Sequence, residues 1–313
     1  MPLHGAREGN VLNQRYALRR RSGAGFGTRS TIWLSKDLLY KLETMRFPKS
    51  LAQTRRMPEK TQLEVDFLQK VGQAWGSTEQ QRVIRILDYF ALDSSFGTHS
   101  CLVLEVLGMS LEELTRRTLL NKFPIPMCKR IIKEVLLGLD FLHRECSIVH
   151  TDKNHHIFHS PEANSADLKS DNFLLRVEDT KGVPLLGDSE SSINLSCVFL
   201  GPSAVVLSDL GVASRIEYLF DGVIQPYALR APEVYLGIPY GPSADIWNLC
   251  CFAFELVTYC RLFYPEATSQ WSRDDDILGL MVSVNGLTSF PVDVLARGSS
   301  KGVPGLRTGT HRW

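Results

Sequence analysis

The chain has 313 residues, of which 44% are apolar and 22% charged, as in a globular protein with a sizeable core. Its formal net charge of +1 excludes a field strong enough to recruit nucleic acid or a membrane surface by itself. The seven cysteines form no Cys-x-x-Cys pair and no Cys/His ligand spacing, so we expect reduced thiols and a location in cytoplasm and nucleus. No apolar run reaches the ~18 residues of a membrane span, and the N-terminus lacks a signal-peptide core.

The first third of the chain is dominated by strand-like segments. Residues 1–14 are polar and predicted to be loose. Strands are expected between Tyr16 and Glu43, around a Gly-rich turn at 23–27, and again at 83–87 and 101–106, with a polar connection at 93–100. The stretch 38–42 is included among these strands. Helices are expected at 58–71, with Leu63, Phe67 and Leu68 on one face, and at 111–119.

The remaining elements are mainly helical. Apolar residues recur at helical spacing from Pro126 to Arg144, and a second, almost wholly apolar helix runs from Ala244 to Tyr259 and is expected to be buried. The apolar run 205–208 predicts a strand. Residues 288–313 are rich in Gly, Ser and Arg and are expected to be disordered. Strands followed by helices predict an α+β protein with a small β-rich lobe and a larger helical lobe.

A Gly-rich loop is the first feature with chemical meaning. Gly25 and Gly27 form a Gly-x-Gly-x-x-Ser pattern with Ser30, and Ile32 lies in the following strand. Glycines let the backbone approach phosphate oxygens, and the apolar residue is suited to cover an adenine ring. The pattern alone is also typical of an ordinary turn.

Two later motifs are more specific. Asp209-Leu-Gly follows an apolar strand, the arrangement that a Mg²⁺-binding carboxylate requires. Ala231-Pro-Glu233 follows, and then Asp245-Ile-Trp247. The order and spacing of these three motifs indicate phosphoryl transfer.

These residues give the chain a resemblance to a known family. Together with His150-Thr-Asp152 and the phrase Glu105-Val-Leu-Gly108, they resemble the SR-protein kinases, which are eukaryotic Ser/Thr protein kinases. The resemblance implies the two-lobed α+β kinase fold, with an N-lobe at 15–107 and a C-lobe at 108–287. Inserts are expected at about 152–167 and 182–202, and the C-terminal helices of the family are expected to be missing.

The resemblance also assigns roles to individual residues. It implies that Glu64 pairs with a strand lysine and that Leu104 is the gatekeeper of the nucleotide pocket. The segment with Glu105 and Leu107 would receive adenine through its backbone. Lys169 would steady the transferred phosphate, and the implied magnesium ligands are Asn172 and Asp209.

The strand lysine departs from the family pattern. In the family, the residue equivalent to Ile32 faces the lysine across a hairpin fifteen positions long. Lys41 is our choice, because removing three residues from each strand would leave a two-residue turn at Lys36–Asp37. Lys49 is the alternative, since its spacing to Glu64 suits the family, although Pro48 is unfavourable in a paired strand.

The catalytic loop is split. Asp152 is preceded by the expected His-Thr, whereas Asp167 has the expected spacing to Lys169 and Asn172. We favour Asp167 as the general base because a short turn keeps the three side chains together. Asp152 stays open as the alternative.

The resemblance implies an ATP- and Mg²⁺-dependent Ser/Thr kinase, expected to be a monomer, that phosphorylates Arg-Ser-rich proteins and binds neither nucleic acid nor membrane. Two alternatives remain: a catalytically impaired pseudokinase that serves as a binding module, and a defective gene model of an active kinase.

Overall fold

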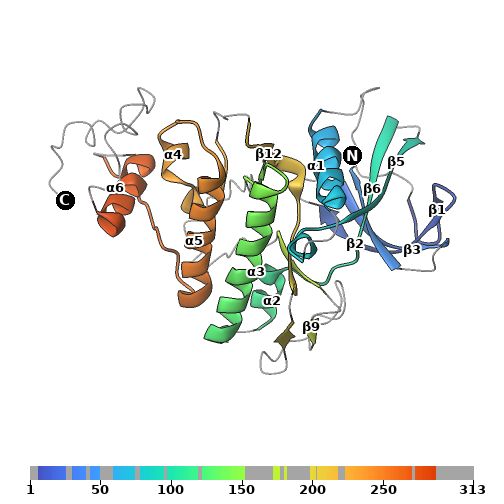
Figure 1. Cartoon of the computed structure of the whole chain (residues 1–313), viewed down its shortest axis with the longest axis horizontal. Coiled ribbons are helices and arrows are strands. Elements are labelled where there is room, and N and C mark those ends of the chain that lie inside the picture. The colour runs from blue at the N-terminus through green and yellow to red at the C-terminus, as the bar shows by residue number, and fades with distance from the viewer. Residues whose placement is uncertain are drawn as a thin grey trace. The chain divides into compact units, whose positions relative to one another are not determined.

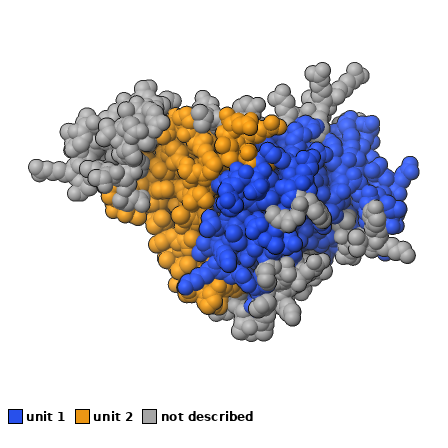
Figure 2. All heavy atoms as spheres, viewed as in Figure 1, with its two compact units in different colours: residues 1–121, 129–146, 169–211 blue, residues 122–128, 147–168, 212–313 orange. Residues whose placement is uncertain are grey.

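The computed structural model describes residues 6–25, 30–39, 43–49, 59–74, 78–94, 97–118, 122–151, 172–176, 180–181, 198–201, 203–217, 223–269 and 272–286. The chain divides into two compact units (Figure 2). Unit 1 comprises residues 1–121, 129–146 and 169–211, and unit 2 comprises residues 122–128, 147–168 and 212–313. Strands prevail in the N-terminal part of the chain and helices in the C-terminal part (Figure 1). No helix among these residues is long and apolar enough to cross a membrane.

Unit 1 contains a six-stranded antiparallel sheet in the order β1-β2-β3-β4-β6-β5. The strands are β1 (Val11–Leu12), β2 (Tyr16–Gly25), β3 (Ser30–Asp37), β4 (Glu43–Lys49), β5 (Ile86–Ser94) and β6 (Gly97–Leu104). Along β3, buried residues alternate with half-buried ones, which is the pattern of a strand with one face on the core. Residues 11 and 12, expected to be loose, are paired with β2.

The hairpin between β3 and β4 corrects the sequence prediction. Lys36 pairs with Glu43, so the predicted two-residue turn at Lys36–Asp37 is wrong, and the strand expected at 38–42 lies at 43–49. Leu38 and Leu39 were assigned to this strand as apolar residues, but they are 46% and 66% exposed. These two leucines are apolar, as strand residues often are, but they lie outside the sheet.

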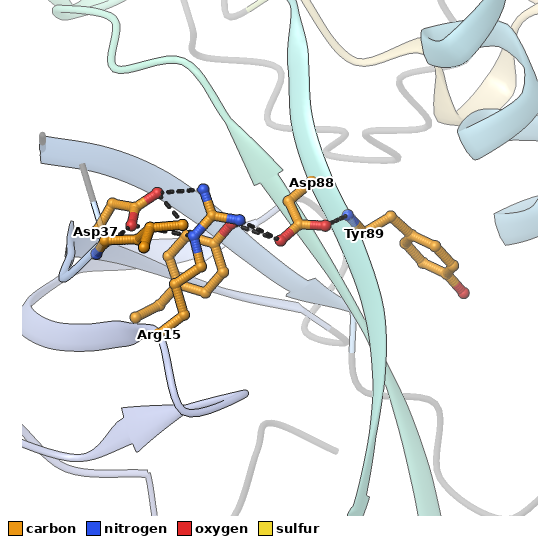
Figure 3. A network of polar contacts seen from close by, with 6 residues as sticks. Arg15, Asp37, Asp88 and Tyr89 are labelled. Atoms are coloured by element: carbon orange, nitrogen blue, oxygen red, sulfur yellow. Dashed lines mark hydrogen bonds and ion pairs between the residues drawn. The ribbon is translucent and has the colours of Figure 1, made fainter.

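A polar network explains why β3 stops at Asp37 (Figure 3). The Asp37 carboxylate accepts hydrogen bonds from Arg15 Nη2 at 2.7 Å and from the backbone N–H of Leu39 at 2.9 Å. Arg15 also reaches Asp88, which accepts a hydrogen bond from the hydroxyl of Tyr16 at 2.6 Å. Burial and this bond raise the pKa of Tyr16 well above its usual range. The network ties the start of β2 and the end of β3 to β5.

The hairpin of β5 and β6 is tighter than expected. The two strands extend to Ser94 and from Gly97, so most of the predicted polar connection at 93–100 is paired strand. Val83, expected in the strand, instead forms an isolated parallel bridge with Leu207.

Helix α1 (Glu59–Gln73) lies against β5 and confirms the helix expected at 58–71. Its buried face carries Val65, Phe67, Leu68 and Val71, whereas Leu63 is exposed. The buried face of α1 therefore differs from the predicted one at Leu63. It consists of residues 64, 65, 67, 68 and 71, which recur at helical spacing. Glu64 lies on this buried face.

The remaining helices are α2 (Leu111–Arg117), α3 (Ile125–Arg144), α4 (Pro232–Tyr235), α5 (Pro242–Thr258) and α6 (Arg273–Asn285). The expected helices at 111–119, 126–144 and 244–259 are confirmed as α2, α3 and α5. Ser110 and Ser272 cap the N-termini of α2 and α6 through their side chains. Helix α5 is less buried than its composition predicts, because Ile246, Phe254 and Val257 are partly exposed.

Short antiparallel strand pairs occur in both units. In unit 1, β8 (Phe173–Leu175) pairs with β11 (Val205–Leu207), and β9 (Thr180–Lys181) pairs with β10 (Phe199–Leu200). In unit 2, β7 (Ile148–Val149) pairs with β12 (Ser214–Arg215). The strand expected at 205–208 is confirmed as β11.

Helix α3 supports β11 closely within unit 1. A Cβ atom added at Gly138 would lie 2.5 Å from Leu207 Cδ1 and 3.1 Å from the carbonyl of Arg82. One turn earlier, the buried Glu134 carboxylate accepts bonds from Arg82 Nε at 2.7 Å and from the backbone N–H of Ser203 at 3.1 Å. The helix thus fixes both ends of the strand that leads to Asp209.

Candidate active site

The two predicted magnesium ligands come together at one end of the β8–β11 pair. Leu207 lies opposite Phe173, and the backbone N–H of Ser208 donates to the carbonyl of Asn172 at 2.8 Å. The Ser208 hydroxyl donates to the same carbonyl at 3.1 Å. Asn172, directly before β8, and Asp209, two residues after β11, therefore lie at the same edge.

Asp209 adopts an unusual backbone conformation. Its φ of 60° lies in the left-handed region, which costs free energy for a residue with a Cβ atom but is tolerated best by Asp and Asn. Its Oδ1 accepts the backbone N–H of Gly211 at 3.3 Å. Such strain is concentrated at functional sites, where the surrounding structure holds it in place.

The donor set at this edge suits magnesium. Asp209 offers carboxylate oxygens and Asn172 an amide oxygen, which are the hard ligands that Mg²⁺ prefers. Among the described residues, no group of three or more His, Cys, Asp or Glu side chains could hold a metal ion. A two-residue site nevertheless fits Mg²⁺, which retains water and phosphate oxygens as its other ligands.

In unit 2, the start of the predicted catalytic loop is anchored by Asp245. Its Oδ2 accepts the backbone N–H of His150 at 2.7 Å and its Oδ1 that of Thr151 at 2.9 Å. The Thr151 hydroxyl donates to the carbonyl of Val212 at 2.6 Å. Thr151 has a φ of 63°, which is a genuine outlier for a β-branched residue. These bonds hold the strained residue directly before Asp152.

The anchoring role of Asp245 was not anticipated from the sequence. The Asp-Ile-Trp motif drew attention to this residue, but a motif does not reveal which distant backbone the carboxylate binds. Three of the predicted catalytic residues, Asp152, Asp167 and Lys169, lie outside the described residues.

The residues predicted to bind nucleotide lie on several strands of unit 1. Leu104 ends β6, and Glu105 and Leu107 follow it; all three are buried. Gly25 pairs with Ser30 at the end of the β2–β3 hairpin where the chain passes from one strand to the other. Ile32 is half-buried in β3, and Glu64 is buried on α1. Gly27 and Lys41 lie outside the described residues.

The register of β3 and β4 bears on which lysine could bind the ATP phosphates. Trp33 pairs with Arg46 and Ser30 with Lys49, so an unbroken register places Phe47 opposite Ile32. Ile32 and the residue opposite it are therefore fifteen positions apart, as in the family, and not nine as the choice of Lys41 assumed. The position opposite Ile32 is therefore phenylalanine, with Arg46 beside it and Lys49 two residues further along. Counting fifteen residues from Ile32 would have revealed this in the sequence.

Several known proteins resemble this chain in sequence. A family model described as "Protein kinase domain" matches residues 45–294. "Serine/threonine-protein kinase SRPK" of Physarum polycephalum is 28% identical over 95% of this chain and 72% of its own length. "Protein kinase dsk1" of Schizosaccharomyces pombe is 26% identical, over 91% of this chain and 68% of its own length. Human "SRSF protein kinase 3" is 24% identical, over 90% and 74%.

Proposed function

Because the chain belongs to the protein kinase domain family, with Ser/Thr kinases among its relatives, we propose that it transfers phosphate from Mg²⁺·ATP to serine in Arg-Ser-rich proteins. The two-lobed α+β fold expected from the sequence is confirmed by this membership. The observation that carries the proposal is the meeting of Asn172 and Asp209 at one end of the β8–β11 pair.

Asn172 and Asp209 would hold the metal through their side-chain oxygens. When bound, Mg²⁺ would neutralise the negative charge of the ATP phosphates, which is the main electrostatic requirement of phosphoryl transfer. The strained conformation of Asp209 supports this role, because a fixed backbone leaves the carboxylate with little reorganisation on binding.

Two carboxylates compete for the role of general base. The anchoring of His150 and Thr151 by Asp245 supports Asp152, because the chain immediately before it is held in a defined conformation. The spacing to Lys169 and Asn172 supports Asp167. We propose that one of them accepts the proton of the substrate hydroxyl and that Lys169 stabilises the phosphate in transfer.

For the phosphates of ATP, we propose Lys49 in place of Lys41 as partner of Glu64, since Lys49 belongs to β4. The glycines Gly25 and Gly27 would cover the phosphates, with Ser30 at the start of β3. The adenine ring would lie between Ile32 and the segment with Leu104, Glu105 and Leu107.

The substrate class rests on the relatives. One of them is named a kinase of SRSF proteins, and the resemblance of the motifs points to the same class. We therefore propose Arg-Ser-rich proteins as substrates.

The test is Mg²⁺-dependent ATP binding by the purified chain, followed by phosphate transfer to an Arg-Ser-rich peptide. Asp209→Ala should abolish transfer. Loss of the base should reduce kcat by about 10²–10⁴-fold, so Asp152→Ala and Asp167→Ala, compared side by side, identify it. Wild-type protein that neither binds nor turns over nucleotide would refute the proposal.

A second function is favoured by one observation. Phe47, rather than lysine, lies opposite Ile32, and a kinase without this lysine binds ATP weakly or positions it poorly. The alternative is thus a pseudokinase that acts as a binding module. A folded protein that binds nucleotide, even weakly, but transfers no phosphate to the peptide would identify it.

A further inference from the structure

Arg176 forms a partly buried ion pair with Glu105. The arginine follows β8, four residues after Asn172, and its Nη1 donates to Glu105 Oε2 at 2.5 Å. The two side chains are only 17% and 9% exposed. The Nη2 group of Arg176 also donates to the carbonyl of Gln81 at 2.7 Å. Charge-assisted pairs shielded from water are held more firmly than surface ion pairs.

The Glu105 carboxylate also binds the chain before β5. Its Oε1 accepts the backbone N–H of Arg85 at 3.0 Å, and the backbone N–H of Glu105 donates to the carbonyl of Arg85 at 3.1 Å. The carboxylate therefore joins Arg85 to Arg176, and its orientation is fixed from two sides.

The segment that begins with Glu105 is also hydrogen-bonded to β8 at residues 108 and 109. The backbone N–H of Gly108 donates to the carbonyl of Leu175 at 2.6 Å, and that of Leu175 donates to the carbonyl of Met109 at 3.0 Å. Residues 105–109 are thus fastened to β8 at one end by these backbone bonds and at the other end by Arg176. All of these residues belong to unit 1.

We propose that Arg176 is a positioning residue that holds residues 105–109 in the conformation that receives adenine, although it touches neither nucleotide nor protein substrate. This inference rests on the proposed ATP-dependent function. A backbone segment recognises a ring through N–H and C=O groups at fixed positions, and prior ordering removes the entropy cost of fixing them on binding. Arg176 also belongs to the same short strand region as Asn172, so one element supports both the adenine segment and a metal ligand.

The variants Arg176→Ala and Arg176→Lys test this role. Lysine keeps the charge but lacks the planar guanidinium, whose Nη1 binds Glu105 while Nη2 binds Gln81. Arg116→Ala is the matched control, because Arg116 forms an exposed ion pair with Glu113 elsewhere in unit 1. Each variant is compared with wild type by adenosine and Mg²⁺·ATP binding, steady-state kinetics and amide hydrogen exchange.

For Arg176→Ala we expect adenosine and ATP affinity to fall by about 10-fold, the KM for ATP to rise similarly and kcat to stay within about 3-fold. Amide exchange at Gly108 and Leu175 should accelerate, and Arg176→Lys should restore part of each effect. Arg116→Ala should resemble wild type.

Unchanged adenosine affinity and unchanged exchange in Arg176→Ala would overturn the inference, as would a loss confined to kcat. If wild type binds no nucleotide, the proposed function fails. The exchange at Gly108 and Leu175 then still decides whether Arg176 orders the segment. If Arg176→Ala fails to fold, Arg176→Lys supplies the same comparison.

Discussion

The carboxylate of Asp245 accepts the backbone N–H of Thr151 at 2.9 Å, although 94 positions separate the two residues. Its other oxygen accepts the N–H of His150. A single side chain at the start of α5 therefore fixes the conformation of the chain before Asp152.

We predict that Asp245→Asn destabilises the protein by about 2–3 kcal/mol. The amide would direct an N–H group at a backbone N–H, which leaves a buried donor without an acceptor. Urea unfolding measures the change. Asp66→Asn, at an exposed hydrogen bond in α1, should cost less than about 0.5 kcal/mol. Equal stability of the two variants would contradict the anchoring role of Asp245.

A pair of glycine substitutions tests the close packing of α3 on β11. Gly138→Ala should lose about 1–3 kcal/mol, because the added methyl group would overlap Leu207. Gly72→Ala is the control in α1, where a Cβ atom meets nothing within 4 Å. It should gain about 0.5–1 kcal/mol, since alanine favours the helix. Thermal unfolding of both variants would show shifts of opposite sign; a gain in both would refute the close approach.

Glu255 should make stability depend on pH. Burial in α5 raises its pKa from 4.5 to about 7, although Arg261 acts in the opposite direction. The folded protein therefore holds a proton that the unfolded chain has already lost, so stability falls as the pH rises from about 4.5 to about 7. Between pH 5 and 8, we expect the unfolding free energy of wild type to drop relative to Glu255→Gln, by up to about 3 kcal/mol. Parallel pH profiles for the two proteins would disprove this assignment.

The network at the end of β3 provides a fourth prediction. Asp37→Asn removes the charge that pairs with Arg15 and weakens the bond to the N–H of Leu39. We expect a loss of about 2 kcal/mol in unfolding free energy, because the carboxylate is largely buried. The control is Asp93→Asn in β5, where Asp93 accepts an exposed hydrogen bond from Thr98. It should change stability by less than about 0.5 kcal/mol. A loss for Asp93→Asn as large as that for Asp37→Asn would show that the network adds nothing specific.

The elements that could be predicted from the sequence are those with a local signal. Helices α1, α2, α3 and α5 carry apolar residues at helical spacing, and β11 is a short apolar run ending before Asp209. The strand expected at 38–42 failed for a tertiary reason. Leu38 and Leu39 look like strand residues, but Arg15 and the N–H of Leu39 bind Asp37 and end β3 there.

The sequence by itself determined the family and the residue types of the candidate site, because Asp209-Leu-Gly, Ala231-Pro-Glu233 and Asp245-Ile-Trp247 are local patterns in a fixed order. Only the tertiary structure decided which of these residues meet. Asn172 reaches Ser208 across 36 positions, and Arg176 reaches Glu105 across 71. The physical reason is that strand register and buried ion pairs depend on distant backbone and side chains, whose partners no local pattern specifies.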